Sequence, residues 1–552
     1  MTSQEIKDAL APLLEGDIDI EEKTLIIYSR DASLFEIKPQ VVIFPKHARD
    51  VGAIVKWVGE NKEKDPTLSI TARSGGTDMS GGAINNSIIL DFTRYMNAIV
   101  SVKDKVAVVQ PGCYYRDFEK ETLKQNWLMP SYTASREICA VGGMVANNAG
   151  GENTVKYGKV EQFIDHLKVV FTDGNEYLVK PLTKAELEAK VAENNFEGSL
   201  YQKIWQLIGE HKEKIMSAKP NVSKNSAGYY LWNVWDEKTQ TFDLCRLIVG
   251  SQGTLGVITE IGFKLVEKPA YGSLLAIFMP SLDHLPEIVN EVMVYKPDSF
   301  ETYDDYSLKL AVTFFFDFFI QMGFVGAVKL GLQFFPEALL MLTGGVPKLT
   351  LLVQFTGDSK EEVQDRLKEL QGKLAHLKLK SRVTRSPIEA EKYWEIRRQS
   401  FNMLRKHVHG KRTAPFVDDI IVKPEHLPEF LPKVEAILDK AKLIYTVAGH
   451  AGDGNFHIIP LMDLNAPYSE DVILNVGKEI YDLVVQYKGS ITAEHNDGIV
   501  RTPYLEIMYG PEITGLFKQT KEIFDPYYIL NPGKKVGGTF EDIKRTLIRK
   551  NN

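Results

Sequence analysis

The sequence predicts an α+β protein with two main domains, the second built on an antiparallel sheet with helices on one face. Three observations lead to this prediction. The chain has 552 residues, which is too long for a single hydrophobic core. Its first half mixes strands and helices with three glycine-rich loops. Beyond Pro269 strands and helices alternate, which is typical of a separate sheet covered by helices.

The elements of the first half follow from short apolar runs and one helical repeat. Val51, Ile54, Val55 and Val58 recur at helical spacing and predict a helix ending near residue 61. Apolar runs bounded by turn residues predict strands at 40–44, 68–72, 88–92, 106–110, 166–172, 247–249 and 257–265.

The same patterns apply to the second half. They predict helices at 285–294, 359–376 and near 511–524, and strands at 274–279, 349–355 and 443–447. Residues 311–342 are very apolar, but Asp317 and Lys329 interrupt them, so no uncharged run is long enough to span a membrane. We expect buried core helices there, with peripheral docking on a membrane as the alternative.

Composition narrows the class of protein. A net charge of −7 argues against nucleic acid as a partner. The 3 cysteines form no C-x-x-C pair, which excludes a disulfide framework or iron–sulfur centre in this chain and suits a reducing cytosol. The N-terminus has no signal-peptide pattern. We therefore expect a cytoplasmic enzyme, with peripheral attachment to the inner face of the membrane as an option.

Glycine-rich loops at 73–83, 140–151 and 250–259 are the first chemical signal. Glycines allow close backbone approach and can form an anion nest. The first loop lacks both the G-x-G-x-x-G spacing of a Rossmann motif and the Gly-Lys-[Ser/Thr] ending of a Walker loop. Three such loops on one strand framework suit a long ligand with a pyrophosphate and a ring system.

The segment Gly449–His457, followed later by Glu494-His495, is the second signal. Two histidines and a glutamate are ligand types for a borderline divalent cation. Their odd spacing would put the histidines on opposite faces of one strand, but a Gly-Asp-Gly turn folds the chain back and aims both at one point. We predict that His450, His457 and Glu494 bind a divalent metal and that His495 is a general base.

These motifs resemble the vanillyl-alcohol oxidase/p-cresol methylhydroxylase superfamily. Pro130-Ser131, V-G-G-M-V-A-N-N-A-G-G, K-Y-G and G-S-Q-G-T-L-G-V-I-T are similar to its branch of D-lactate, glycolate and D-2-hydroxyglutarate dehydrogenases, and the likeness extends from Tyr28 to Lys534. It implies a two-subdomain FAD-binding (PCMH-type) domain over 1–269, a substrate or cap domain over 270–490 with an apolar insertion, and a C-terminal segment, 491–552, that returns to the flavin.

The resemblance also implies the cofactor contacts. Thr77 stands where covalent relatives carry a flavin-linked histidine, so the FAD is expected to be non-covalent. The implied FAD-binding residues are Arg73, Ser74, Gly75, Gly76, Thr77, Gly81, Pro111, Gly112, Gly142, Gly143, Asn147, Asn148, Gly151, Gly253, Gly256, Val257, Ile258 and Asn531.

The catalytic assignment combines the resemblance with the chemistry of the residues. The family comparison gives the same metal and base roles to the His450 set, with zinc or manganese as the expected metal. The W-x-x-R pattern points to Arg397 as the group that binds the substrate carboxylate, and Arg501 is a second candidate. Val417 stands where relatives acting on larger diacids have a lysine, which favours smaller monoacids.

The predicted activity is oxidation of a D-lactate-like D-2-hydroxy acid by hydride transfer to FAD, with electrons passed to a quinone, cytochrome or flavoprotein. Alternatives are a D-2-hydroxyglutarate or glycolate dehydrogenase and a non-catalytic flavin subunit of a larger complex. Lipid-precursor synthesis on alkyl-dihydroxyacetone phosphate would require a histidine-rich tract, which the sequence lacks. The sequence does not specify an oligomeric state.

Overall fold

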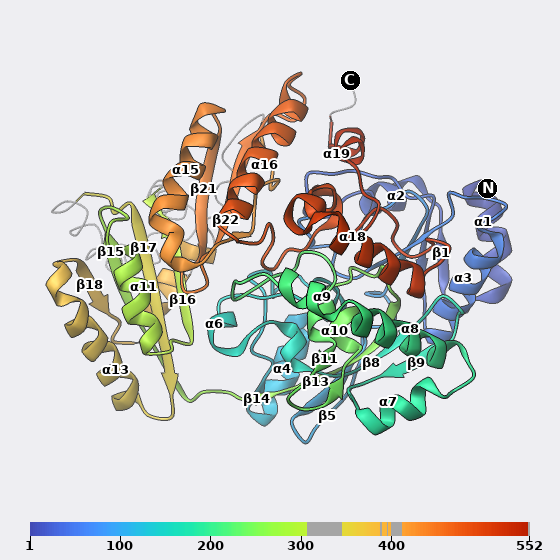
Figure 1. Cartoon of the computed structure of the whole chain (residues 1–552), viewed down its shortest axis with the longest axis horizontal. Coiled ribbons are helices and arrows are strands. Elements are labelled where there is room, and N and C mark those ends of the chain that lie inside the picture. The colour runs from blue at the N-terminus through green and yellow to red at the C-terminus, as the bar shows by residue number, and fades with distance from the viewer. Residues whose placement is uncertain (306–344, 387–388, 395, 399–410, 550–552) are drawn as a thin grey trace, which may run out of the picture.

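The computed structural model of the chain describes all residues except 306–344, 387–388, 395, 399–410 and 550–552 (Figure 1). The apolar segment 311–342 therefore lies outside the described residues, and the prediction of buried core helices there stays a prediction. Within the described part of the chain, no helix is both long and apolar enough to cross a membrane.

A small sheet near the N-terminus has strand order β1-β2-β4-β3 and is parallel except for β1. Every residue of β2 is buried, because its two faces pack in different hydrophobic clusters. Helix α3 (Ala48–Asn61) covers one of these faces, as predicted. The strands are β1 (Asp17–Asp19), β2 (Val41–Phe44), β3 (Ile70–Arg73) and β4 (Ile88–Asp91).

A second, antiparallel sheet has the order β5-β6-β13-β8-β9. It confirms the predicted strands near 106–110, 166–172 and 257–265. The prediction of a strand at 247–249 is wrong, because α10 (Cys245–Ile248) is one helical turn buried in the core beside this sheet. A run of three apolar residues predicts burial, but it is too short to show whether the segment is a strand or a helix. The strands are β5 (Ile99–Lys103), β6 (Val106–Val109), β8 (Ile164–Val170), β9 (Glu176–Val179) and β13 (Val257–Lys264).

Further elements complete the first half. The helices are α1 (Ser3–Leu10), α2 (Glu22–Tyr28), α4 (Tyr115–Thr122), α5 (Val141–Asn147), α6 (Thr154–Tyr157), α7 (Lys184–Val191), α8 (Phe196–Glu210) and α9 (Lys212–Ala218). Short strands pair as β7 (Trp127–Leu128) with β14 (Val266–Glu267), and as β10 (Leu182–Thr183), β12 (Thr241–Phe242) and β11 (Trp235–Asp236).

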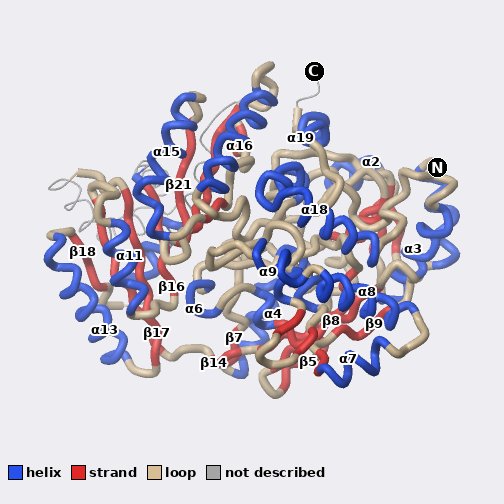
Figure 2. The backbone as a smooth tube through the Cα atoms, in the orientation of Figure 1, coloured by secondary structure: helices blue, strands red, loops and turns tan. Residues whose placement is uncertain are grey.

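An eight-stranded antiparallel sheet dominates the second half, in the order β18-β15-β17-β16-β21-β22-β19, with β20 also on β22. Figures 1 and 2 show α11, α13 and α15 in front of it, and α16 packs in the same core, which confirms the predicted helix-covered sheet. The strands are β15 (Tyr271–Met279), β16 (Ser299–Asp304), β17 (Leu349–Gly357), β18 (Lys380–Val383), β19 (Arg412–Thr413), β20 (Ile420–Ile421), β21 (Ile444–His450) and β22 (Asn455–Met462). The helices are α11 (Leu285–Val294), α13 (Lys360–Lys373), α15 (Leu427–Lys440) and α16 (Ser469–Gln486).

The two faces of this sheet have different roles. On β21 and β22, Val447, Phe456 and Ile458 point into the core beneath the helices. Because side chains alternate along a strand, His450 and His457 belong to the opposite face, which we call the pocket face.

The end of the chain returns to the first half. Helix α18 (Leu505–Phe524), kinked at Gly510, packs on α8 and α9, and Leu530 forms a parallel bridge with Ile70 of β3. The remaining α-helices of the described residues are α17 (Gly498–Arg501) and α19 (Phe540–Thr546). The C-terminal segment thereby ties the glycine-rich loops to the segment that carries Glu494 and His495.

Candidate active site

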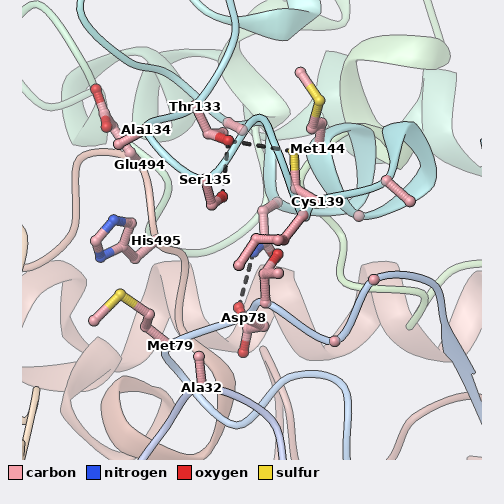
Figure 3. A pocket seen from close by; sticks show the side chains of 18 of the residues that line it. Ala32, Asp78, Met79, Thr133, Ala134, Ser135, Cys139, Met144, Glu494 and His495 are labelled. Atoms are coloured by element: carbon pink, nitrogen blue, oxygen red, sulfur yellow. Dashed lines mark hydrogen bonds between the residues drawn. The ribbon is translucent and has the colours of Figure 1, made fainter. Parts of the chain in front are cut away.

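One large cavity, of about 1070 Å³, joins the glycine-rich loops to the pocket face. Loop residues of the first half line one part of it, and His450, His457, Glu494 and His495 line another. Figure 3 shows the His495 ring at the cavity between Ser135 on one side and Met79 on the other. The two chemical signals of the sequence therefore meet in one space.

Glycines in the first part of the cavity wall let neighbouring segments of the chain pack closely. A Cβ on Gly142 would lie 2.6 Å from Pro111 Cβ, and one on Gly75 would lie 2.9 Å from the Ile138 carbonyl oxygen. Larger residues at these places would collide with the cavity wall or narrow it.

An unsatisfied carboxylate oxygen also points to a ligand in this part of the cavity. Asp31 lines the cavity, and its buried Oδ2 has no hydrogen-bond partner among the described residues. A hydroxyl-bearing ligand would satisfy it. The residues of this part of the cavity are therefore compatible with FAD, because its ribityl and ribose groups carry hydroxyls that could bind this oxygen.

The structure separates the predicted FAD-binding residues into two groups. The following line the cavity: Arg73, Ser74, Gly75, Gly76, Thr77, Pro111, Gly142, Gly143, Asn147, Gly151, Gly253, Gly256 and Ile258. The others, which do not line it, are Gly81, Gly112, Asn148, Val257 and Asn531.

Asn531 illustrates what the second group does. Its amide donates to the carbonyl oxygens of Gly82 at 2.9 Å and Gln252 at 2.7 Å, and its oxygen accepts from Thr71 at 3.0 Å. Asn531 thus links three segments of the cavity wall without lining the cavity itself.

The β21–β22 hairpin brings the two histidines together. A tight turn, with Gly454 at φ +75°, reverses the chain, and Ala448 pairs with His457. As a result, His450 Nε2 lies 3.3 Å from His457 Nε2 and 3.4 Å from Glu494 Oε2. The sequence argument about the Gly-Asp-Gly turn correctly describes this geometry.

Carboxylates that the sequence analysis missed orient all three histidines. Glu301 of β16 lies 2.6 Å from His450 Nδ1. Asp418 lies 3.2 Å from His457 Nδ1 and 2.6 Å from His495 Nδ1. With each Nδ1–H donated to a carboxylate, the Nε2 atoms are left as the basic nitrogens, and those of His450 and His457 face each other across 3.3 Å. A shared cation stabilises such an arrangement, and metal-bound histidines usually have such carboxylate partners.

The distances fit a small divalent ion. Ligand atoms in a tetrahedral site with bonds near 2.0–2.1 Å are about 3.3–3.4 Å apart. Asp419, His457, Glu494 and His495 also come within 4.8 Å of one another. Asp419 is an unsuitable ligand, because its Oδ2 already accepts from the backbone N–H groups of Glu494 and His495 at 2.8 and 2.7 Å.

Charge supports the same conclusion. Among the described side chains, three carboxylates pair directly with the histidines. Two permanent cations and a fourth carboxylate extend this ion-pair network, which leaves two negative charges to balance. A divalent ion would balance them. The carboxylates are Glu301, Asp418, Asp453 and Glu494, and the cations are Lys224 and Arg397.

The same charges shift the pKa values of the cluster. Burial opposes protonation of His450, but Glu301 and Glu494 outweigh it and raise its pKa to about 9. Burial is likewise outweighed at His495, where Asp418 and Asp419 raise the pKa to about 9. At Glu494 burial favours the neutral acid, yet His450 and Lys224 hold its pKa well below the usual range. The cluster therefore attracts positive charge and keeps Glu494 ionised, and a bound divalent ion would supply that charge in place of protons on the imidazoles.

The two candidate arginines differ in position. Arg397 lines the cavity, and its Nε lies 2.7 Å from Glu301 Oε2. Arg501 is fully buried outside the cavity lining and donates to the carbonyl oxygens of Asn496 at 2.8 Å and Asp418 at 2.6 Å. Arg501 thus supports the loop that carries His495 and the backbone of Asp418.

One sequence signal for the missed residues exists. Asp418 and Asp419 stand inside the apolar run 416–422, where charged residues are costly unless they are paired. Glu301 and Lys224 are single charges in distant segments, and no local pattern distinguishes them.

The comparisons with known proteins support the flavin-binding part of this site. Residues 39–179 match the family model described as an FAD binding domain, and residues 268–535 match FAD linked oxidases, C-terminal domain. The chain is 26% identical over 533 residues to "D-2-hydroxyglutarate dehydrogenase" of Escherichia coli (strain K12), covering 94% of this chain and 50% of that protein. It is 25% identical over 509 residues to "D-lactate dehydrogenase" of Anaerostipes hadrus, covering 90% of this chain and 89% of that protein.

The solved structure of p-cresol methylhydroxylase with substrate bound has the same fold. It superposes with a TM-score of 0.67 at 16% identity, covering 98% of this chain and 97% of that one. The fold and cavity thus define a flavin-binding protein of the PCMH type. Together the two matched domains span most of the chain, which therefore belongs to the family described as FAD linked oxidases and shares the fold of p-cresol methylhydroxylase. It spans about half the length of the Escherichia coli relative.

Proposed function

We propose that the protein is an FAD- and divalent-metal-dependent dehydrogenase that oxidises a D-2-hydroxy acid to the 2-oxo acid. The observation that carries the proposal is the His450/His457/Glu494 set, with ligand-like separations of 3.3 and 3.4 Å, in the same cavity as the glycine-rich loops. We also propose residues 1–269 as the cofactor domain, 270–490 as the cap and 491–552 as the returning segment.

The residues of the chain have distinct tasks in this reaction. His495, held through Nδ1 by Asp418, presents Nε2 to the cavity and accepts the proton of the substrate hydroxyl. Arg397, held by Glu301, binds the substrate carboxylate. Bound FAD would accept the hydride, and a divalent ion held by His450, His457 and Glu494 would increase the acidity of the substrate hydroxyl.

The substrate we favour is a small monoacid such as D-lactate. On the pocket face, Thr446, Ala448 and Ile459 line the cavity beside the histidines and offer no charge to a second carboxylate. The names of the relatives keep D-2-hydroxyglutarate and glycolate as alternatives. A non-catalytic flavin subunit is disfavoured, because the chain retains the complete ligand set and base.

The electron acceptor belongs to the same proposal. A quinone, cytochrome or electron-transfer flavoprotein would reoxidise a non-covalent FAD. Zinc or manganese suits the mixed histidine and carboxylate ligands. The proposed peripheral membrane contact concerns residues 311–342, which lie outside the described residues.

Anaerobic reduction of the purified holoenzyme tests the proposal. D-lactate should bleach the flavin absorbance, L-lactate should not, and a chelator should abolish bleaching until Zn²⁺ or Mn²⁺ is restored. D-2-hydroxyglutarate and glycolate serve as substrate controls. Absence of bleaching by every D-2-hydroxy acid in a panel would contradict the assigned reaction, and bleaching that resists the chelator would contradict the metal.

A further inference from the structure

Lys224 is buried beside the histidine cluster, and only 1% of its side chain is exposed. Its Nζ lies 2.6 Å from Glu494 Oε1 and 2.9 Å from Asp453 Oδ2. Two carboxylates therefore lie within ion-pair distance of this one buried ammonium group. A permanent ammonium group therefore sits directly behind a metal-ligand candidate.

The two oxygens of Glu494 have different surroundings as a result. Oε2 faces His450 Nε2 at 3.4 Å, whereas Oε1 accepts from Lys224. Gly150 adds a steric limit on Oε1, because a Cβ at this position would lie 2.6 Å from that oxygen. Lys224 and the backbone of Gly150 therefore enclose Oε1, and only Oε2 is directed at the histidines.

We propose that Lys224 is a positioning residue that keeps Glu494 a monodentate ligand. Coordination positions on the bound ion then stay open for the hydroxyl and carboxylate of the substrate. This inference rests on the proposed metal site. A carboxylate can bind a cation through one oxygen or two, and the choice determines how many positions remain for other ligands. With three protein ligand atoms, a catalytic site keeps room for substrate.

A second consequence concerns charge. An ammonium group that shares the Glu494 carboxylate withdraws negative charge from it, so the bound ion stays a stronger acid toward the substrate. Removing the ammonium group would strengthen the attraction between Glu494 and the ion. Loss of Lys224 should therefore preserve metal binding and impair substrate binding, whereas a purely structural lysine would lose both together.

The experiment compares the FAD-loaded wild type with Lys224→Met after exchange into Mn²⁺. We expect Lys224→Met to bind Mn²⁺ at least as tightly as the wild type by titration. Electron paramagnetic resonance in ¹⁷O-water should show one fewer water molecule on the ion. The substrate concentration for half-maximal flavin reduction should rise tenfold or more.

Asp453→Asn is the matched control, because it removes the other partner of Lys224 and leaves the contact with Glu494. It should keep the wild-type water number. If Lys224→Met fails to fold, Gly150→Ala crowds the same oxygen, because its Cβ would lie 2.6 Å from Oε1, and should also change the water number.

The outcomes separate the two proposals. A wild type that binds no Mn²⁺ would overturn the metal site itself, and the role of Lys224 with it. If the wild type binds Mn²⁺, two results for Lys224→Met would overturn only the role of Lys224. One is an unchanged water number, and the other is loss of Mn²⁺ binding in parallel with activity.

Discussion

His495 is the residue on which the proposed chemistry depends most. Asp418 fixes its Nδ1 at 2.6 Å, and the ring lies at the cavity. His495→Gln should slow anaerobic flavin reduction by roughly 10²–10⁴-fold, the usual contribution of a positioned general base. FAD and metal content should stay at wild-type levels, because His450, His457 and Glu494 remain in place.

Stopped-flow absorbance and elemental analysis measure these quantities. A second variant, Asp418→Asn, keeps the size of the side chain but alters the charge that orients His495 and His457, so it should slow the reaction as well. His495 lies close enough to His457 and Glu494 to act as a ligand. Loss of the metal in His495→Gln would therefore assign it that role and contradict the assignment as base.

A second prediction for a single residue concerns Asp31 and the pH dependence of stability. Burial and the nearby Asp78 raise its pKa to about 7. Between the unfolded value near 4 and pH 7, the folded FAD-free protein holds a proton that the unfolded chain releases, so this group makes stability fall as pH rises. The slope is about 1.4 kcal/mol per pH unit for one fully coupled proton.

Asp31→Asn replaces the titrating carboxyl group with an amide, so the variant lacks this proton uptake. In the FAD-free protein, unfolding midpoints measured from pH 5 to 7 should therefore fall more steeply for the wild type than for the variant. Parallel curves for the two proteins would show that Asp31 has an ordinary pKa.

At the scale of elements, the β21–β22 hairpin creates the site. Gly454 adopts φ +75°, and a Cβ there would lie 2.0 Å from the Val422 carbonyl oxygen. Gly454→Ala should therefore distort the turn, cost more than about 1 kcal/mol of stability and abolish metal binding. Thermal unfolding and metal titration test this.

Gly209 in α8 is the matched control for the hairpin variant. A Cβ at Gly209 meets nothing within 4 Å, and the residue lies within a helix. Gly209→Ala should therefore be neutral or stabilising by about 0.5–1 kcal/mol, with wild-type metal binding. Similar losses in both variants would show that the hairpin turn has no special role.

The sequence predicts features that a local pattern encodes, but not contacts between segments far apart in the chain. The hairpin, helix α11 and the glycine-rich loops carry local patterns, and each was predicted from them. Glu301, Asp418 and Lys224 reach the site from three separate segments, so only tertiary packing brings them together. Asn531 was expected at the flavin from the resemblance, but in the structure it supports the loops from behind.

At the scale of the whole molecule, the cavity exists because two large parts of the chain meet across it. Arg398 of the second half pairs with Glu152 of the first at 2.9 Å, and Lys156 pairs with Asp298. The segment after α16 then adds Glu494 and His495. The glycine-rich loops and the proposed metal ligands therefore become neighbours only in the folded chain.

Metal binding should consequently stabilise the whole molecule. The proposed ligands His450 and His457 come from one hairpin, and Glu494 comes from a loop tied by Lys224 to the first half. An ion bound by the folded state alone contributes about 2.7 kcal/mol when its free concentration is 100 times Kd. Chelation should lower the thermal unfolding midpoint of the FAD-loaded wild type by about 2 °C, and added Zn²⁺ or Mn²⁺ should restore it. His457→Gln should already unfold at the lower midpoint and respond to neither treatment. A chelator effect of equal size in His457→Gln would mean that the stabilising ion binds elsewhere.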